Sequence, residues 1–177
     1  MASQLRVDKI VPVDGVPTGG GGGIIQVKST TKTDTFTTST SDAFVDITGL
    51  SVTITPKFNT SKILIFYDTQ LSGTELMFIQ LVRDSTAIKV GDSDGANRVE
   101  CTAGGFLQES NQDKCVPFSG TFLDSPATTS ATTYKLQGRV YGTSQNFKVN
   151  TPNNDSNASY TGRACSTITV ASFLAET

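Results

Sequence analysis

Apolar and polar residues alternate with a period of two along most of the chain after Ile24. In LSVTIT, Leu50, Val52 and Ile54 share one face of an extended chain, and serine and threonine share the other. Because successive side chains of a β-strand point to opposite faces of a sheet, this spacing predicts a strand with one buried face. The chain has no convincing amphipathic helix.

Similar short runs, bounded by Gly, Pro, Asn, Asp and Ser, predict further strands. The predicted strands are residues 24–30, 34–38, 43–47, 50–55, 62–68, 76–83, 115–123, 132–141, 146–150 and 166–174. So many short strands with short connections predict an all-β fold, an antiparallel β-sandwich of the jelly-roll type, as in a TNF/C1q-like knob. A Greek-key variant stays an alternative, because the pattern does not determine strand order.

Two predicted strands, KILIFYD (residues 62–68) and LMFIQLVR (residues 76–83), are apolar on both faces. An antiparallel sheet with one face in water alternates cleanly, so these strands need a second cover. A loop or the other sheet of the same subunit is one candidate. We favour a second copy of the chain under closed symmetry, because monomers avoid large exposed apolar patches. The candidate interface residues are Leu64, Phe66, Met77, Ile79 and Leu81.

The chain before Ile24 divides into two parts, LRVDKIVPV and the run GVPTGGGGG. We expect residues 1–18 to be an extended N-terminal attachment arm, residues 19–23 a glycine linker and residues 24–177 the sandwich domain. The arm alternates, and we expect it to pair by strand addition with a neighbouring subunit or another particle protein. Its candidate contact residues are Leu5, Val7, Asp8, Ile10 and Val11.

The glycine run does not fit a phosphate site. A P-loop ends in GK[ST] before a helix, whereas this run leads into a predicted strand. The dinucleotide pattern GxGxxG also fails, because Ile24 occupies its sixth position. The glycine run is either a flexible linker or an ordered stretch of backbone that passes close to other atoms.

Composition narrows the function. The net charge is -2 and no cluster of Lys and Arg is present, so we expect no nucleic-acid partner. No window approaches 18 apolar residues and no signal peptide begins the chain, so we expect no membrane insertion. The chain has no histidine, no CxxC pair and no compact acidic cluster, so we expect no enzyme activity, no metal and no cofactor. DSDGAN resembles the opening of a calcium loop, but lacks the glutamate that should close it.

The longest polar segment is NTPNNDSNASYTGR, residues 150–163. Its apolar content is too low for packing, so we expect an exposed loop. It is either a solvated connection or a contact loop at a distal tip. The candidate contact residues are Asn153, Asn154, Asp155 and Tyr160.

Three parts of the sequence together resemble known proteins. LRVDKIVPVDG is similar to the short LKVD-type opening of many fibre-like phage virion proteins. GGGGGIIQVKSTTKTDTF, FVDITGLSVTITP, SKILIFYD and STITVASFLAE resemble small β-rich structural proteins of tailed phages, especially phages of marine cyanobacteria. The resemblance implies a homotrimeric β-sandwich on the virion, assembled in the host cytoplasm, with the arm docked on other virion proteins.

The favoured hypothesis is therefore a virion structural protein, displayed as a short tail fibre or fibre-like receptor-binding protein. The fibre-like opening favours the tail, and a host cell-surface receptor or glycan is then a further partner. A capsid (head) decoration or fibre protein is the alternative. A soluble carbohydrate-binding module is more distant, because the sequence has no evident aromatic or acidic sugar cleft.

Overall fold

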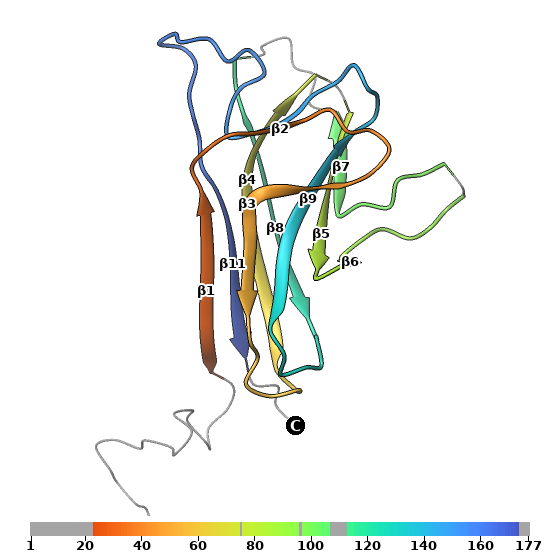
Figure 1. Cartoon of the computed structure of the whole chain (residues 1–177), viewed down its shortest axis with the longest axis vertical. Coiled ribbons are helices and arrows are strands. Elements are labelled where there is room, and N and C mark those ends of the chain that lie inside the picture. Colours follow the sequence, from red (N-terminus) through yellow and green to blue (C-terminus); the bar gives the residue numbers. More distant parts are fainter. Residues whose placement is uncertain (1–22, 75, 96, 107–112, 174–177) are drawn as a thin grey trace, which may run out of the picture.

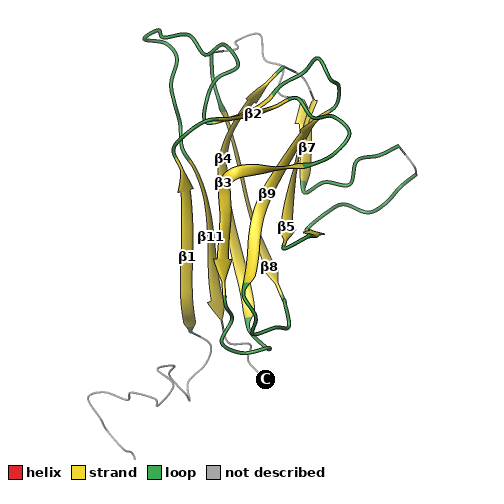
Figure 2. Ribbon diagram, viewed as in Figure 1, coloured by secondary structure: helices red, strands yellow, loops and turns green. Residues whose placement is uncertain are grey.

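Two antiparallel sheets pack face to face (Figures 1 and 2). The computed structural model describes residues 23–74, 76–95, 97–106 and 113–173, and these contain strands but no helix. Sheet A contains β1 (Ile24–Lys32), β2 (Phe36–Thr38), β4 (Lys62–Gly73), β8 (Val116–Asp124), β10 (Phe147–Val149) and β11 (Ser166–Phe173). Sheet B contains β3 (Val45–Ile54), β5 (Leu76–Arg83), β6 (Thr86–Ile88), β7 (Ala103–Phe106) and β9 (Thr132–Val140).

The strand order is that of a jelly roll. In sheet A, β4 pairs with β8 on one side, and with β11 and then β10 on the other, while β1 pairs with β11. In sheet B, β9 lies between β3 and β5, and β5 also pairs with β6 and β7. The main rows are therefore β1-β11-β4-β8 and β3-β9-β5-β7, and along these eight strands the chain crosses between the rows at every step except from β5 to β7. The predicted all-β antiparallel sandwich is confirmed.

The core lies between the sheets, where the alternation predicts it. Leu50, Val52 and Ile54 of β3 are at most 5% exposed. They pack with inward side chains of the other strands, among them Ile63, Ile65, Tyr67, Leu71, Tyr134, Leu136, Val140, Phe147, Val149, Ile168 and Val170. This burial supplies the main favourable free energy of folding.

The structure corrects one part of the predicted subunit interface. Met77, Ile79 and Leu81 of β5 are 3%, 2% and 0% exposed and belong to the core of their own subunit. They face sheet A, so a neighbouring copy has no access to them. The sequence pattern shows that both faces of β5 are apolar, but it does not show which face points inward.

The clearest differences from the predicted strands are at β3, β6 and β7. Residues 43–47 and 50–55 were expected as separate strands, but β3 runs from Val45 to Ile54 with an irregular register between Asp46 and Ser51. Gly49 has a φ of 86° within this irregularity, a conformation that glycine adopts without steric cost. The short strands β6 and β7 were not predicted, and both pair with β5.

The sandwich has two distinct ends. β1 begins and β11 ends at the same end, where Ile24 pairs with Phe173. The connection from β10 to β11 lies at the opposite end, which is uppermost in Figure 1. The predicted arm, residues 1–18, and residues 19–22 of the predicted glycine linker lie outside the described residues. The described chain therefore enters the sandwich at the end opposite the predicted contact loop.

Candidate functional site

The outer face of sheet A carries a group of apolar side chains, and four of them, Ile24, Val27, Phe66 and Leu123, are exposed. Val27, Ala171, Leu64 and Leu123 are consecutive neighbours across β1, β11, β4 and β8. Val27 and Leu123 are each 56% exposed, and Phe66, two residues along β4 from Leu64, is 43% exposed. Ile24, 61% exposed, stands at the start of β1 on the same sheet. We call Ile24, Val27, Leu64, Phe66, Leu123 and Ala171 the outer apolar surface.

Hydroxyl side chains continue this face toward the other end of the sandwich. Ser29 and Thr169 hydrogen-bond at 2.8 Å, and Thr31 and Thr167 at 3.1 Å, across β1 and β11. A shallow depression of about 450 Å³ lies beside Phe66, and Asp68, Ser119, Thr121, Thr167 and Thr169 contribute to its walls. Apolar and hydroxyl groups thus dominate the face.

The two charged side chains of β4 on this face are both hydrogen-bonded within the sheet. Lys62 Nζ donates to Ser125 Oγ at 2.7 Å, and the Asp68 carboxylate accepts from Ser119 Oγ at 2.7 Å. Lys62 lies at one edge of the outer apolar surface, at the start of β4. Asp68 lies beyond Phe66, between the hydroxyl side chains of Thr167 and Ser119 on the neighbouring strands. Neither charge interrupts the outer apolar surface between them.

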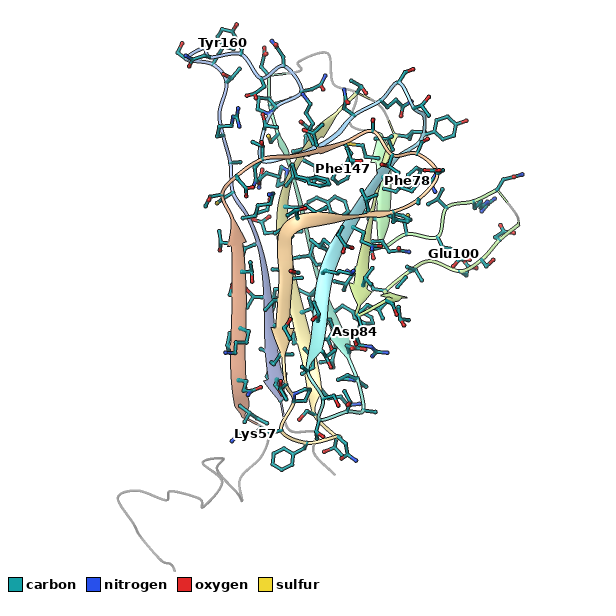
Figure 3. All side chains as sticks on the ribbon, viewed as in Figure 1. Lys57, Phe78, Asp84, Glu100, Phe147 and Tyr160 are labelled. Carbon is teal, nitrogen blue, oxygen red and sulfur yellow. The ribbon has the colours of Figure 1, made fainter. Side chains whose placement is uncertain are left out.

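The predicted contact loop lies at the far end of the molecule, and Tyr160 stands at its outer edge (Figure 3). Tyr160 is 68% exposed. The other three candidates make contacts within the subunit. Asn153 O accepts from Lys148 Nζ at 2.8 Å, Asn154 Nδ2 donates to Asp113 Oδ1 at 2.7 Å, and Asp155 pairs with Arg163 at 2.6 Å. The loop is therefore held by polar contacts within the subunit, two of them with residues outside the loop, Lys148 and Asp113.

Asn150 anchors the base of this loop. Its side chain is fully buried, and its φ of 62° places it in the left-handed region that asparagine tolerates. Asn150 Nδ2 donates to Lys32 O at 2.9 Å and to Asp34 O at 3.0 Å, and Asn150 Oδ1 accepts from Ser166 Oγ at 2.6 Å. One side chain thus joins the end of β1 to the start of β11 beneath the loop.

A partly buried ion pair joins the two sheets. Arg83 of β5 donates to both carboxylate oxygens of Asp124 on β8, at 2.8 and 2.9 Å, and Tyr134 Oη donates to Asp124 Oδ2 at 2.7 Å. Burial, followed by the hydrogen bond to Asp124, raises the pKa of Tyr134 above its usual value. The phenol therefore stays protonated as a donor to Asp124, and the cluster acts as a link between sheets.

Two of the three cysteines, Cys101 and Cys115, are partly buried, and Cys165 is exposed. Burial raises the pKa of the Cys101 and Cys115 thiols, so both stay largely protonated and weakly nucleophilic at neutral pH. Within the described residues, no group of three or more His, Cys, Asp or Glu side chains is placed to hold a metal ion. The same residues contain no helix of the length and apolarity that crossing a membrane requires.

Comparisons with known proteins do not assign a family. No protein-family model matches the chain, and no curated protein sequence matches it. Among solved structures, a chain in the structure of infectious bursal disease virus, Gx strain, is similar with a TM-score of 0.31 and 15% identity. The similarity covers 85% of this chain and 42% of that chain, so this chain spans less than half of its length. This likeness is too low to carry an argument about function.

The predicted site residues lie in different parts of the molecule. Leu64 and Phe66 lie on the outer face, as a subunit interface requires, although the interface itself stays a prediction. Val27 and Leu123 lie on the same face but were not among the predicted interface residues. The signal for Leu123 was available, because adjacent apolar Phe122 and Leu123 must point to opposite faces of β8. The arm candidates Leu5, Val7, Asp8, Ile10 and Val11 lie outside the described residues.

Proposed function

We propose that this chain is a structural protein of a phage particle, displayed on the surface as a homotrimer of β-sandwich knobs. The observation that carries the proposal is the outer apolar surface on sheet A. Four of its side chains, Ile24, Val27, Phe66 and Leu123, are between 43% and 61% exposed. Monomeric soluble proteins rarely leave such a group uncovered, so a protein surface covers it in the assembled state.

A second copy of the chain is the best occupant of this surface. The face bears apolar and hydroxyl side chains, and Lys62 and Asp68 are already hydrogen-bonded within their own sheet. A copy of the same face therefore meets little charge repulsion, and a charged partner finds little to recognise. Closed rotational symmetry, with its axis along the strands, places every start of β1 at one end.

This arrangement suits a trimer that is displayed on the surface of a virion. The resemblance of the sequence to small phage structural proteins supports a virion location, and the fibre-like opening supports a short tail fibre or receptor-binding protein. The arm, residues 1–18, attaches the trimer to other virion proteins, and the loops around residues 150–163 point away from the particle. Several identical tips then bind a host surface with avidity, so that each one needs only modest affinity.

Light scattering of the purified chain tests the assembly. We expect three times the chain mass of 18.7 kDa for the native protein. Phe66→Asp and Leu123→Asp should each shift the mass to that of one chain, because a charge on the outer apolar surface opposes burial. Thr53→Asp, on an exposed position of sheet B, should keep the trimer. A one-chain mass for the native protein would contradict the proposal.

Two experiments on virions test the location. Antibody against the sandwich should label the phage tail, and labelling across the head would replace the fibre assignment with capsid decoration. Deletion of residues 1–18 should leave a folded trimer that no longer enters virions. Normal incorporation of the shortened chain would show that the arm is not the attachment element.

A further inference from the structure

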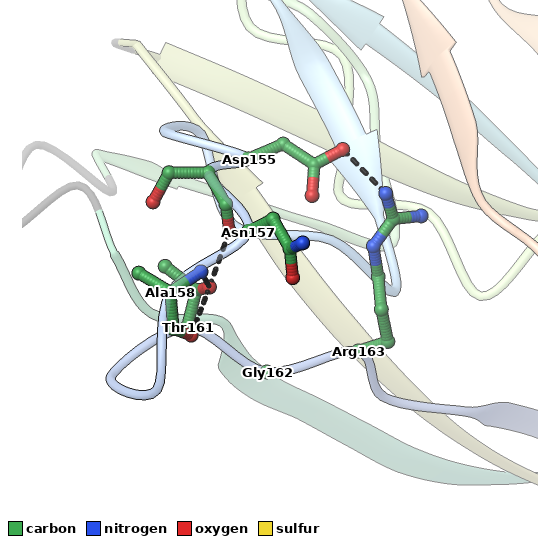
Figure 4. Close-up of a pocket in the computed structure, with 7 residues that line it drawn as sticks. Asp155, Asn157, Ala158, Thr161, Gly162 and Arg163 are labelled. Carbon is green, nitrogen blue, oxygen red and sulfur yellow. Dashed lines mark hydrogen bonds and ion pairs between the residues drawn. The ribbon is translucent and has the colours of Figure 1, made fainter.

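A polar pocket of about 290 Å³ lies in the loop at the end of the sandwich opposite the start of β1 (Figure 4). Its volume is close to the lower limit of small-molecule sites, about 300 Å³, so it suits one ring-sized ligand. The residues that line it all come from one connection between β10 and β11: Asp155, Ser156, Asn157, Ala158, Thr161, Gly162 and Arg163.

Hydrogen bonds within the loop hold the pocket in shape. Thr161 Oγ1 donates to Ser156 O at 2.5 Å or to Ala158 O at 2.9 Å, and the Thr161 N–H donates to Ala158 O at 3.1 Å. The Ala158 N–H in turn donates to Ser156 O at 3.0 Å. Together with the buried anchor at Asn150, these contacts prepare the walls before a ligand arrives, which lowers the entropic cost of binding.

The charges of the pocket indicate a neutral ligand. The Arg163 guanidinium and the Asp155 carboxylate pair at 2.6 Å, and their side chains are 58% and 38% exposed. An anion would compete with Asp155 for Arg163, and a cation would compete with Arg163 for Asp155. A neutral molecule with several hydroxyl groups can instead hydrogen-bond to the free edges of both groups, since each retains donor or acceptor capacity.

A second observation points to a hydroxylated ligand. The Ser156 hydroxyl oxygen is buried at the pocket and has no hydrogen-bond partner among the described residues. Buried polar atoms normally have a partner, so this oxygen has an unused hydrogen-bonding capacity, which a bound molecule reaches once the Ser156 side chain rotates toward the pocket. Asn157 adds an exposed carboxamide with both a donor and an acceptor.

We propose that this pocket binds one neutral sugar ring of a host-surface polysaccharide. The assignment rests on the proposed function, because it names the ligand class that the displayed tip recognises. Vicinal hydroxyls of the sugar bind Asp155, Asn157 and Arg163, and one hydroxyl partners Ser156. The exposed ring of Tyr160, at the outer edge of the same loop, provides an apolar face for the next sugar of the chain.

Saturation-transfer NMR on the full chain tests this assignment, with the methyl glycosides of glucose, galactose and mannose as probes. At least one neutral glycoside should receive saturation, and glucuronic acid and choline should not. Arg163→Ala should weaken that binding at least tenfold. Arg98→Ala is the matched control, because Arg98 forms a similarly exposed ion pair with Asp94 at 2.8 Å in another loop, and it should bind like the native chain.

Three outcomes would overturn the inference: no saturation of any neutral glycoside, preferred binding of glucuronic acid, or unchanged binding by Arg163→Ala. Asn157→Ala provides a second variant at an exposed position, where misfolding is not expected. The measurement is independent of the mass determination. A trimer that binds no sugar contradicts this inference alone, whereas a monomer that binds sugar contradicts only the proposed assembly.

Discussion

The outer faces of the two sheets are covered in different ways. On sheet B, the Asp46 carboxylate accepts hydrogen bonds from Lys135 and Gln137, at 2.8 and 2.7 Å. Arg139 lies 5.8 Å from the ring centre of Phe44 and 5.9 Å from that of Phe78. Polar and cationic groups of the same subunit therefore cover the outward apolar side chains of this sheet.

Sheet A has no comparable cover over its outward apolar side chains in the described residues. Leu64 and Phe66 of β4 point outward from their sheet, as Phe78 of β5 does from its own. Phe66 nevertheless stays 43% exposed. Phe78 also packs over Gly104 of β7, where an added Cβ atom would lie 2.5 Å from the ring. Strands that are apolar on both faces thus have two solutions: β5 is covered within the subunit, and we infer that β4 is covered by another copy.

The largest expected effect distinguishes the inward face of β5 from the outer face of β4. Ile79→Ala should lower the free energy of unfolding by about 2–5 kcal/mol, because it leaves a cavity among fully buried neighbours. Leu64→Ala should cost less in an isolated subunit, since Leu64 is half-buried on the outer face. Urea denaturation of both variants at a concentration that keeps the chain monomeric measures the difference. Equal losses of unfolding free energy would contradict the assignment of Ile79 to the core and of Leu64 to the outer face.

A somewhat smaller effect is expected at the link between the sheets. Asp124→Asn should lower the free energy of unfolding by about 2 kcal/mol, because the half-buried Arg83 loses its charged partner. Asp94→Asn removes one side of an ion pair that is 75% and 65% exposed, and should change stability by less than about 0.5 kcal/mol. Thermal unfolding compares the two variants. Similar values would mean that burial adds nothing to the Arg83–Asp124 pair.

The smallest effect concerns the polar cover of sheet B. Burial raises the pKa of Asp46, but the hydrogen bonds from Lys135 and Gln137, together with the charge of Lys135, outweigh it and lower the pKa overall. A lowered folded-state pKa stabilises the protein above the unfolded value and loses this contribution as pH falls through the folded value. Asp46→Asn should therefore cost less than about 1 kcal/mol at pH 6, and the difference should shrink toward pH 3. Denaturant unfolding at both pH values measures it, and a difference that grows in acid would reverse the sign.

Most of the fold was predictable from the sequence. Within the described residues, the ten predicted strands correspond to nine observed ones, because two predicted strands form a single β3 with an irregular register around Gly49. The strands that were missed are explained by their composition. β7 reads AGGF and β6 has three residues, so neither has enough alternation to be recognised, and their strand structure depends on pairing with β5.

The candidate site was less predictable. Asp155 and Tyr160 were recognised as residues of an exposed loop, but the pairing of Asp155 with Arg163 depends on how residues 155–163 turn back on themselves. Asn150 was placed in the same polar segment, yet it is fully buried beneath the loop. A polar sequence does not reveal whether an amide points to water or bonds to strands that are distant in the chain.

The period-two pattern by itself determined the fold class and divided each strand into two faces, because the alternation of side chains is a local property of an extended backbone. Tertiary structure alone decided which face of β5 is buried and which apolar side chains stay exposed on sheet A. Those outcomes depend on strands brought together from opposite ends of the chain, as β1 and β11 are. The outer apolar surface exists because Val27, Leu64 and Leu123 meet only after the sheet has formed.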